Sequence, residues 1–234
     1  LLGVTPAQYG DARRLARLKA GLKQGESVTN AMYDAGYGAA SRLYERSNSQ
    51  LGMTPASYAK GGKGARMGYT ITPSPLGRLM VAATAQGVCF LSLGEDAHLI
   101  AELRREYPLA EIVADEIVLG DWVRTVVAYL EGAIPHPNLP LDVQGTAFQR
   151  RVWQELMQIP AGVTRTYSEL AEQISGKATA RRAVARGCAT NPVSLIIPCH
   201  RVVRGDGGLG GYRWGLERKA ALIAAERERR EKAG

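Results

Sequence analysis

Apolar positions follow a helical period at the front of the chain, a strand-like pattern in the middle and a helical period again towards the end. In residues 11–23 an alanine and three leucines recur on one side of a predicted helix, opposite three arginines. Between residues 69 and 91, short β-prone runs are separated by Gly77 and Gly87, which is typical of hairpins. Further helices are predicted at residues 28–35, about 39–50, 97–107, 119–130, 148–157, 164–175 and about 179–190. The pattern indicates a multidomain α+β protein with an all-α front.

Capping residues support several of these helix boundaries. Ser27 can cap the second helix, and Gly36 can adopt the left-handed conformation that ends it. Near the other end of the chain, Thr166 and Glu169 have the spacing of a capping box, and Gly176 follows as a stop. The helix after Gly176 carries a small apolar face, so the two predict a helix-turn-helix in the C-terminal part.

A short repeat marks the front of the chain. "LGVTPAQY" at residues 2–9 returns as "LGMTPASY" at residues 51–58, with six of eight positions identical. Two short helices joined by a glycine turn precede the second copy and predict a helix-turn-helix, with a plain helical bundle as the alternative. The stretch "AGYGAASRLYERSNSQLGMTPASY" at residues 35–58 resembles the AraC-type transcription regulators. That resemblance implies a DNA-binding unit with Arg42 and Arg46 on its outer helix.

Charge is distributed unevenly along the chain. The net charge is +6 over residues 1–66, −6 over residues 67–147 and +8 over residues 148–234. Two basic modules around an acidic one favour contact with a polyanion at both ends, although an uneven solvated surface remains the alternative. No apolar run approaches the ~18 residues of a membrane span, so no membrane partner is expected.

The cysteines and the linker complete the outline. Cys89, Cys188 and Cys199 have neither disulfide-framework nor zinc-site spacing, so no metal and a reducing cytoplasm are expected. Cys89 and Cys188 fall on apolar faces and are predicted to be core residues. His98 and His136 are expected on the surface. The predicted division is a helix-turn-helix remnant at 1–60, a glycine-lysine linker at 61–67, a supporting α/β subdomain at 68–147 and a basic helix-turn-helix domain at 148–234.

The strongest candidate for chemistry is the run "IPCHRVV". Cys199 can act as a nucleophile only as a thiolate. His200 could take its proton directly or through a water, and Arg201 is a nearby positive charge. Pro198 could begin a helical turn whose amides stabilise negative charge. A buried structural cysteine beside a core histidine is the alternative that the residues alone leave open.

This run resembles the active-site signature of the O6-alkylguanine-DNA alkyltransferases. "RTYSELA", "ARRAVARG", "NPVSLIIPCHRVV" and "GGYRWGLERKAALIAAE" occur in the family's order, and the resemblance covers about residues 68–227. It implies a ribonuclease-H-like subdomain followed by a winged-helix domain. Joined to the AraC-like front, the chain resembles the bacterial Ada-type adaptive-response proteins. Their zinc domain, which senses methyl-phosphotriesters, would precede the first residue here.

The resemblance implies catalytic roles for five residues. Cys199 would accept the methyl group, and His200 would deprotonate it through a water. Glu226 would orient His200, Asn191 would brace the turn that carries the cysteine, and Tyr167 would donate a hydrogen bond to the flipped guanine.

The resemblance also implies two groups of binding residues. Arg182 would fill the space that the extruded base leaves in the stack. The predicted DNA-binding residues are Arg181, Arg182, Arg186, Arg201, Arg42 and Arg46. The predicted substrate pocket comprises Tyr212, Arg213, Trp214, Val202 and Lys219. Family members often have serine and glycine where this chain has Arg213 and Trp214, so the size of alkyl group accepted is an open question.

The resemblance, together with the charge pattern and the cysteine, implies direct-reversal repair of DNA in a bacterial, nucleoid-associated cytoplasmic protein. The methyl group of O6-methylguanine, and also of O4-methylthymine, would pass irreversibly to Cys199 in a single turnover, without metal or other cofactor. Double-stranded DNA containing O6-alkylguanine is the predicted partner, with promoter DNA bound through residues 1–60. One alternative is a regulator that recognises lesions without transfer. A Cys-His hydrolase is another, weakened by the lack of an identifiable oxyanion site.

Overall fold

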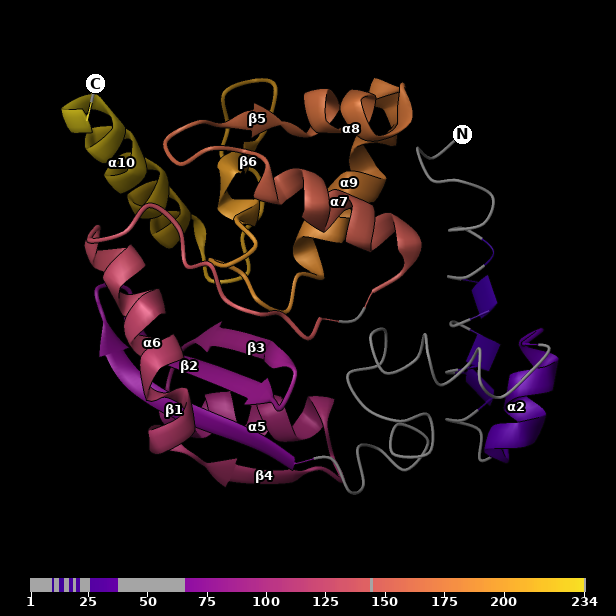
Figure 1. Cartoon of the computed structure of the whole chain (residues 1–234). Coiled ribbons are helices and arrows are strands. Elements are labelled where there is room, and N and C mark those ends of the chain that lie inside the picture. The colour runs from indigo at the N-terminus through magenta and orange to yellow at the C-terminus, as the bar shows by residue number, and fades with distance from the viewer. Residues whose placement is uncertain are drawn as a thin grey trace.

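The computed structural model describes residues 10, 13–14, 17–18, 20–21, 26–37, 66–143 and 145–233 (Figure 1). In the front part, the described positions between 10 and 21 are helical, and α2 spans Val28–Asp34. Ser27 caps α2 by accepting a hydrogen bond from the Asn30 amide at 3.2 Å. Gly36 follows with φ +82°. The predicted cap and stop are therefore confirmed, whereas Arg42, Arg46, the repeat tails and the predicted helix at 39–50 lie outside the described residues.

A four-stranded sheet forms the centre of the acidic middle. Strands β1 (Arg66–Ser74), β2 (Gly77–Thr84) and β3 (Gly87–Leu93) form an antiparallel meander, which confirms the predicted hairpins. A fourth strand, β4 (Glu111–Ala114), pairs in parallel with β1 and gives the order β3-β2-β1-β4. Strand β4 was not predicted from the sequence, because four residues, of which only Ile112 and Val113 are half-buried, carry too little pattern.

Each face of this sheet is covered by one helix (Figure 1). Side chains alternate along β2, so that Leu79 and Val81 face one core and Met80 the other. Helix α5 (Asp96–Glu106) covers the second face, and α6 (Glu116–Glu131) packs on the first. Because α6 also faces the C-terminal part, its buried side chains reach the cysteine-bearing segment.

The C-terminal part is built from helices around two very short strands. Its helices are α7 (Ala147–Met157), α8 (Tyr167–Ser175), α9 (Arg181–Ala189) and α10 (Leu216–Ala233). Strand β5 (Arg165–Thr166) pairs in parallel with β6 (Val202–Val203), and 3-10 turns form at Ala178–Ala180 and Cys199–Arg201. The capping box of Thr166 and Glu169 is present, and Gly176 ends α8 with φ +68°. The predicted pair α8–α9 is thus confirmed.

The small residues of α9 have a packing role inside the protein. A Cβ at Gly187 would lie 3.1 Å from Val152 of α7, and the Gly187 carbonyl accepts a 2.9 Å hydrogen bond from the Trp153 indole. Cys188 beside it is buried, as predicted. The described part of the chain is a mixed α/β structure, and none of its helices combines the length and apolar character needed to cross a membrane.

Candidate active site

A tight turn before the 3-10 helix fixes the position of Cys199. The Asn191 side chain donates to the Ile197 carbonyl at 2.8 Å and accepts from the Val193 amide at 3.1 Å. Between them, Leu195 has φ +83° although it is not a glycine, and its side chain is fully buried. Such a conformation persists only where the surroundings enforce it. The turn is therefore braced at both ends, with Cys199 following directly.

Cys199 lies in a cavity of about 370 Å³ between α8, α9 and the segment before α10. Its side chain is 6% exposed, so the sulfur is reached through the cavity and not from the outer surface. The lining residues are Tyr167, Ala185, Cys188, Ala189, Ser194, Cys199, Gly211, Tyr212 and Arg213. The cavity is bordered by rings and small side chains, which suits a flat, partly apolar group.

The surroundings of Cys199 act on its charge in opposite directions. Burial raises the pKa of the thiol, whereas Ser194, Asn191 and the Lys219 ammonium each lower it. Burial also lowers the pKa of Lys219, which donates to the Val202 carbonyl at 2.6 Å. Because the net shift for Cys199 is upward, the resting group is a neutral thiol.

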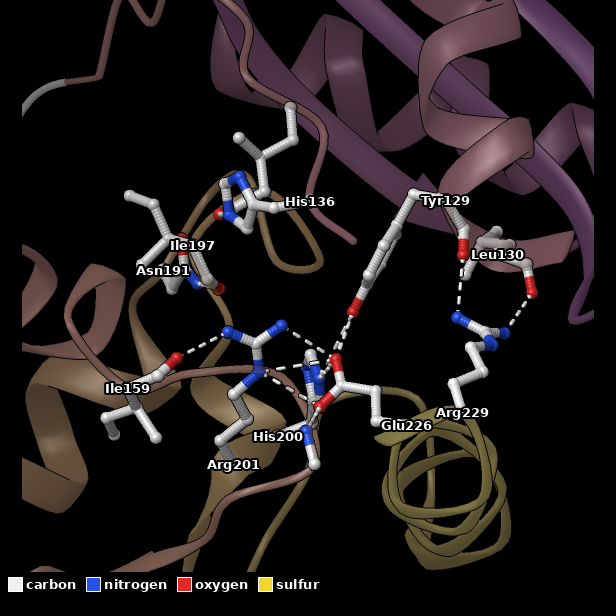
Figure 2. Close-up of polar contacts among 12 residues, drawn as sticks. Tyr129, Leu130, His136, Ile159, Asn191, Ile197, His200, Arg201, Glu226 and Arg229 are labelled. Carbon is white, nitrogen blue, oxygen red and sulfur yellow. Dashed lines mark hydrogen bonds and ion pairs between the residues drawn. The ribbon is translucent and has the colours of Figure 1, made fainter. Parts of the chain in front are cut away.

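His200 does not line the cavity and lies in a buried polar network (Figure 2). Its Nε2 lies 3.1 Å from Glu226 Oε1, and the same oxygen accepts a 2.6 Å hydrogen bond from the Tyr129 hydroxyl. Glu226 Oε2 accepts from the Gly162 amide at 3.0 Å. Burial alone would raise the pKa of Glu226, but hydrogen bonds and charge from His200 and Arg201 hold it well below its usual range. Glu226 is therefore a carboxylate.

This network selects one tautomer of His200. A carboxylate only accepts hydrogen bonds, so the proton of the neutral ring lies on Nε2, facing Glu226. Burial lowers the pKa of His200, which keeps the ring neutral at rest. Nδ1 then carries a lone pair, is buried, and makes no hydrogen bond to any described residue, Cys199 included. The site holds a free base beside a thiol without direct contact between them.

Comparison with known proteins assigns each part of the chain to a family model. Residues 67–143 match the ribonuclease-like domain of 6-O-methylguanine DNA methyltransferase, and residues 147–228 match its DNA binding domain. Residues 1–61 match a helix-turn-helix domain.

Relatives cover either the whole chain or its second and third parts. The bifunctional transcriptional activator/DNA repair enzyme Ada of Escherichia coli is 44% identical over 98% of this chain, which spans 65% of that protein's length. The methylated-DNA–protein-cysteine methyltransferase of Methanosarcina barkeri is 39% identical over 68% of this chain and 97% of its own length. The chain belongs to the methylated-DNA–protein-cysteine methyltransferase family. The crystal structure of Mycobacterium tuberculosis OGT in complex with DNA superimposes with a TM-score of 0.59 at 34% identity, covering 69% of this chain and 94% of that one.

One predicted DNA-binding residue of this methyltransferase family member is placed differently by the structure. Arg201 is 2% exposed; its Nε and Nη2 donate to the Glu226 carboxylate and its Nη1 to the Ile159 carbonyl (Figure 2). The prediction that Arg201 binds DNA was wrong, because its guanidinium is paired inside the protein. The reason is geometric, because a 3-10 turn has three residues per turn and directs successive side chains about 120° apart. When Cys199 faces the cavity, Arg201 faces the interior.

The acidic middle contributes more to this methyltransferase site than its sequence indicated. His136 was expected on the surface, but it is half-buried, and its Nε2 lies 2.8 Å from the Ile196 carbonyl of the cysteine-bearing turn. The Leu91 amide of β3 donates to the Pro192 carbonyl at 2.9 Å. Tyr129 was missed as a site residue, because an apolar position on an amphipathic helix gives no sign of a hydroxyl contact 97 residues away. His98 is exposed, as expected.

The predicted pocket residues of the methyltransferase fall into two layers. Tyr212 and Arg213 line the cavity together with Tyr167. Trp214, Val202 and Lys219 do not line it, and are buried behind it; the Trp214 ring packs edge-on against Tyr212 with centroids 5.5 Å apart.

Two further features border the cavity. Arg213 pairs with Glu102 of α5 and lies over the Phe90 ring. Cys188, predicted to be a packing residue, is buried and also reaches the cavity.

The arginines of α9 stand on the outer surface of the helix-turn-helix. Arg181, Arg182 and Arg186 are exposed, and within the described ranges no carboxylate pairs with any of them. Their exposure leaves three positive charges open to a partner on the same helix that supplies Ala185, Cys188 and Ala189 to the Cys199 cavity. In the same ranges no group of three or more His, Cys, Asp or Glu side chains is arranged to hold a metal ion.

Proposed function

We propose that this chain repairs alkylated DNA directly, by transferring the methyl group of O6-methylguanine, and also of O4-methylthymine, to Cys199. The observation that carries the proposal is the neutral, buried Cys199 at a cavity of about 370 Å³, backed by a histidine whose free nitrogen is a base. The family matches support the same reaction, which corresponds to a methylated-DNA–protein-cysteine S-methyltransferase.

Access to the target requires the nucleotide to leave the duplex, because its O6 atom lies inside the base stack. The exposed arginines of α9 supply positive charge for the phosphates, and Arg182 enters the stack in place of the extruded base. Burial raises the pKa of Tyr167 to about 12, so this phenol keeps its proton and donates a hydrogen bond to the guanine ring. Tyr212 borders the pocket from the opposite segment.

The transfer conserves atoms and charge. The thiol proton of Cys199 passes through a water to Nδ1 of His200, and the positive ring is balanced by the Glu226 carboxylate. The thiolate attacks the methyl carbon in line, the S–C bond forms and the C–O6 bond breaks. The electron pair stays on the guanine, whose ring nitrogen takes a proton from water, and the positive His200 ring returns its proton to the hydroxide so formed, so that the net change moves the thiol proton to the guanine. The product is a thioether that offers no carbonyl for water to attack, so each molecule acts once.

Each of the proposed domains has its own part in this function. Residues 68–147 form a ribonuclease-H-like subdomain, supported by an antiparallel meander joined through α5 to a parallel β4. Residues 148–234 form the winged-helix catalytic domain, with α8–α9 as its helix-turn-helix. Residues 1–60, joined through the linker at 61–67, bind promoter DNA and give the protein a transcription-regulating role. The helix-turn-helix match at residues 1–61 and the similarity to Ada support this last part.

The test is incubation with a duplex containing O6-methylguanine, followed by intact and peptide mass analysis. One added CH₂ per chain is expected on Cys199, and none on the Cys199→Ala variant, which should still bind the duplex. Cys89→Ala is the matched control, because Cys89 is buried in β3 away from the cavity. Methylation of the Cys199→Ala variant at Cys188 would show that Cys188, and not Cys199, accepts the methyl group. Binding without any methylation of the native chain would favour the regulator that only recognises lesions.

A further inference from the structure

Ser194 lines the cavity beside Cys199 and lowers the pKa of its thiol. Its side chain is 2% exposed, and its Oγ lies 3.4 Å from the Sγ atom of Cys199. Within the part of the chain that the structure describes, the Ser194 hydroxyl has Cys199 Sγ as its hydrogen-bond partner. A hydroxyl this deeply buried with a thiol as its partner is placed for contact with the reacting atom.

The backbone of the turn determines this contact. Leu195, directly after Ser194, has the positive φ described above, and Ser194 forms a β-bridge with Ile197. Together they fold the chain back so that Ser194 and Cys199, five residues apart, face each other. Because a non-glycine residue adopts positive φ at a cost, a relaxed turn would separate the two side chains.

The chemistry of the pair changes when the thiol ionises. With a neutral thiol either group can donate, and the bond is weak. A thiolate only accepts, so the serine must then donate, and a hydrogen bond to a charged acceptor is about twice as strong as one between neutral groups. Asn191 also lowers the pKa of Cys199, and its Nδ2 gives one of its two protons to the Ile197 carbonyl, so Asn191 acts beside Ser194 and is unchanged in a Ser194 variant.

We propose that Ser194 stabilises and orients the Cys199 thiolate, by donating its hydroxyl proton into a hydrogen bond with Sγ while the sulfur attacks. No proton leaves Ser194 in this role. The thiol proton still goes to His200, and the hydroxyl rotates to follow the charge. This inference deepens the proposed function and rests on it for the DNA substrate, but the contact itself can be tested without DNA.

Other ionisable groups face Cys199 and are unchanged by a substitution at Ser194. They are Lys219 of α10, Tyr167 of α8, Cys188 of α9 and Tyr212 of the segment before α10, and His200 adjoins Cys199 in the chain. A change in the pH dependence of Cys199 between variants at residue 194 therefore reports the hydroxyl.

The experiment measures alkylation of Cys199 by iodoacetamide as a function of pH, read from the mass of the Cys199 peptide. In Ser194→Ala the apparent pKa of this reaction should rise by about 1 to 2 pH units, the effect of losing one hydrogen bond to a charged group. The rate at pH 7 should fall about 10- to 100-fold, and the two profiles should converge as the pH is raised. Methyl transfer from O6-methylguanine duplex should show the same loss at pH 7.

Two controls separate this effect from general damage. Thr70→Val removes another buried hydroxyl, which donates to the Asp115 carbonyl at 2.9 Å in β1, and it should leave the profile unchanged. Ser194→Thr and Ser194→Val form a matched pair, because threonine and valine have side chains of nearly the same shape and only threonine carries a hydroxyl. Their profiles should differ as Ser194 and Ser194→Ala do, which gives a second comparison if the alanine variant does not fold.

The outcomes are distinct. An unchanged iodoacetamide profile in Ser194→Ala, or a rate lowered equally at every pH, overturns the role of Ser194. If the iodoacetamide profile of Ser194→Ala is shifted but the native chain never demethylates DNA, the contact between Ser194 and Cys199 is supported and the proposed function is refuted. A shifted iodoacetamide profile together with slower methyl transfer at pH 7 supports both the role of Ser194 and the proposed function.

Discussion

The ion pair between Arg201 and Glu226 makes the sharpest prediction about this protein. Replacing Arg201 with methionine keeps much of the side-chain volume and removes the charge. Glu226 would keep Tyr129, His200 and Gly162 as hydrogen-bond donors, but would lose the neighbouring positive charge. The substitution would also remove the 2.5 Å hydrogen bond that Arg201 Nη1 donates to the Ile159 carbonyl.

The expected cost follows from burial, since both side chains of the pair are 3% exposed. Breaking a buried pair by removing one partner costs about 3–5 kcal/mol. For a domain of this size each kcal/mol lowers Tm by about 2–4 °C, so Arg201→Met should melt about 6–20 °C below the native chain. Arg201 also lowers the pKa of His200, so in the variant that pKa should rise. Burial depresses the folded pKa of His200, so this residue costs stability as the pH falls below its unfolded pKa. The variant, in which that pKa is less depressed, should lose less, and its deficit should therefore shrink below about pH 6.

The assay pairs thermal or urea unfolding with the salt dependence of duplex binding, measured below both melting points. Arg201→Met should leave the slope of log affinity against log salt unchanged. Arg186→Ala is the matched control: this exposed arginine should lower the slope by about 0.9 for one lost phosphate contact, with a stability change within about 0.5 kcal/mol. If Arg201→Met were as stable as the native chain and had a reduced salt slope, Arg201 would face DNA and the buried network would be wrong.

Four further predictions test other parts of the site. Tyr129→Phe keeps the ring but removes a 2.6 Å hydrogen bond to a carboxylate, so urea unfolding should show a loss of about 1.5–3 kcal/mol; a loss below about 0.5 kcal/mol would mean that the hydroxyl is not engaged. The folded pKa of Glu226 is depressed, so its contribution to stability should be complete above about pH 5 and be lost as the pH falls through the folded value, a dependence absent from Glu226→Gln. Arg182→Ala should slow transfer from duplex more than from free methylated base, because unstacking costs a few kcal/mol; equal slowing would assign Arg182 to chemistry or folding. Deleting residues 1–66 should reduce the salt slope of binding but not the transfer rate at saturating DNA, and a lost rate would show that the front helps to form the site.

Local signals were sufficient where the determining contacts lie within one turn. Thr166 and Glu169 cap α8 through bonds spanning three residues, and Gly176 ends it because glycine tolerates positive φ. The short β-prone runs and the glycines between them likewise predicted the meander. The same locality made Cys199 and His200 recognisable as a pair, because the chain itself holds them together.

The sequence by itself therefore determined the helices with clear caps, the hairpins and the cysteine as the candidate nucleophile. Only the tertiary structure decided what each neighbour of that cysteine does. Arg201 is adjacent to His200 in sequence, yet its partner is Glu226, 25 residues away, and the Tyr129 that completes the network is 97 residues from Glu226. Burial supplies the physical reason, because a charge removed from water must find its counter-charge and hydrogen bonds wherever packing brings them. The local sequence pattern around Arg201 therefore does not indicate which distant residues it contacts.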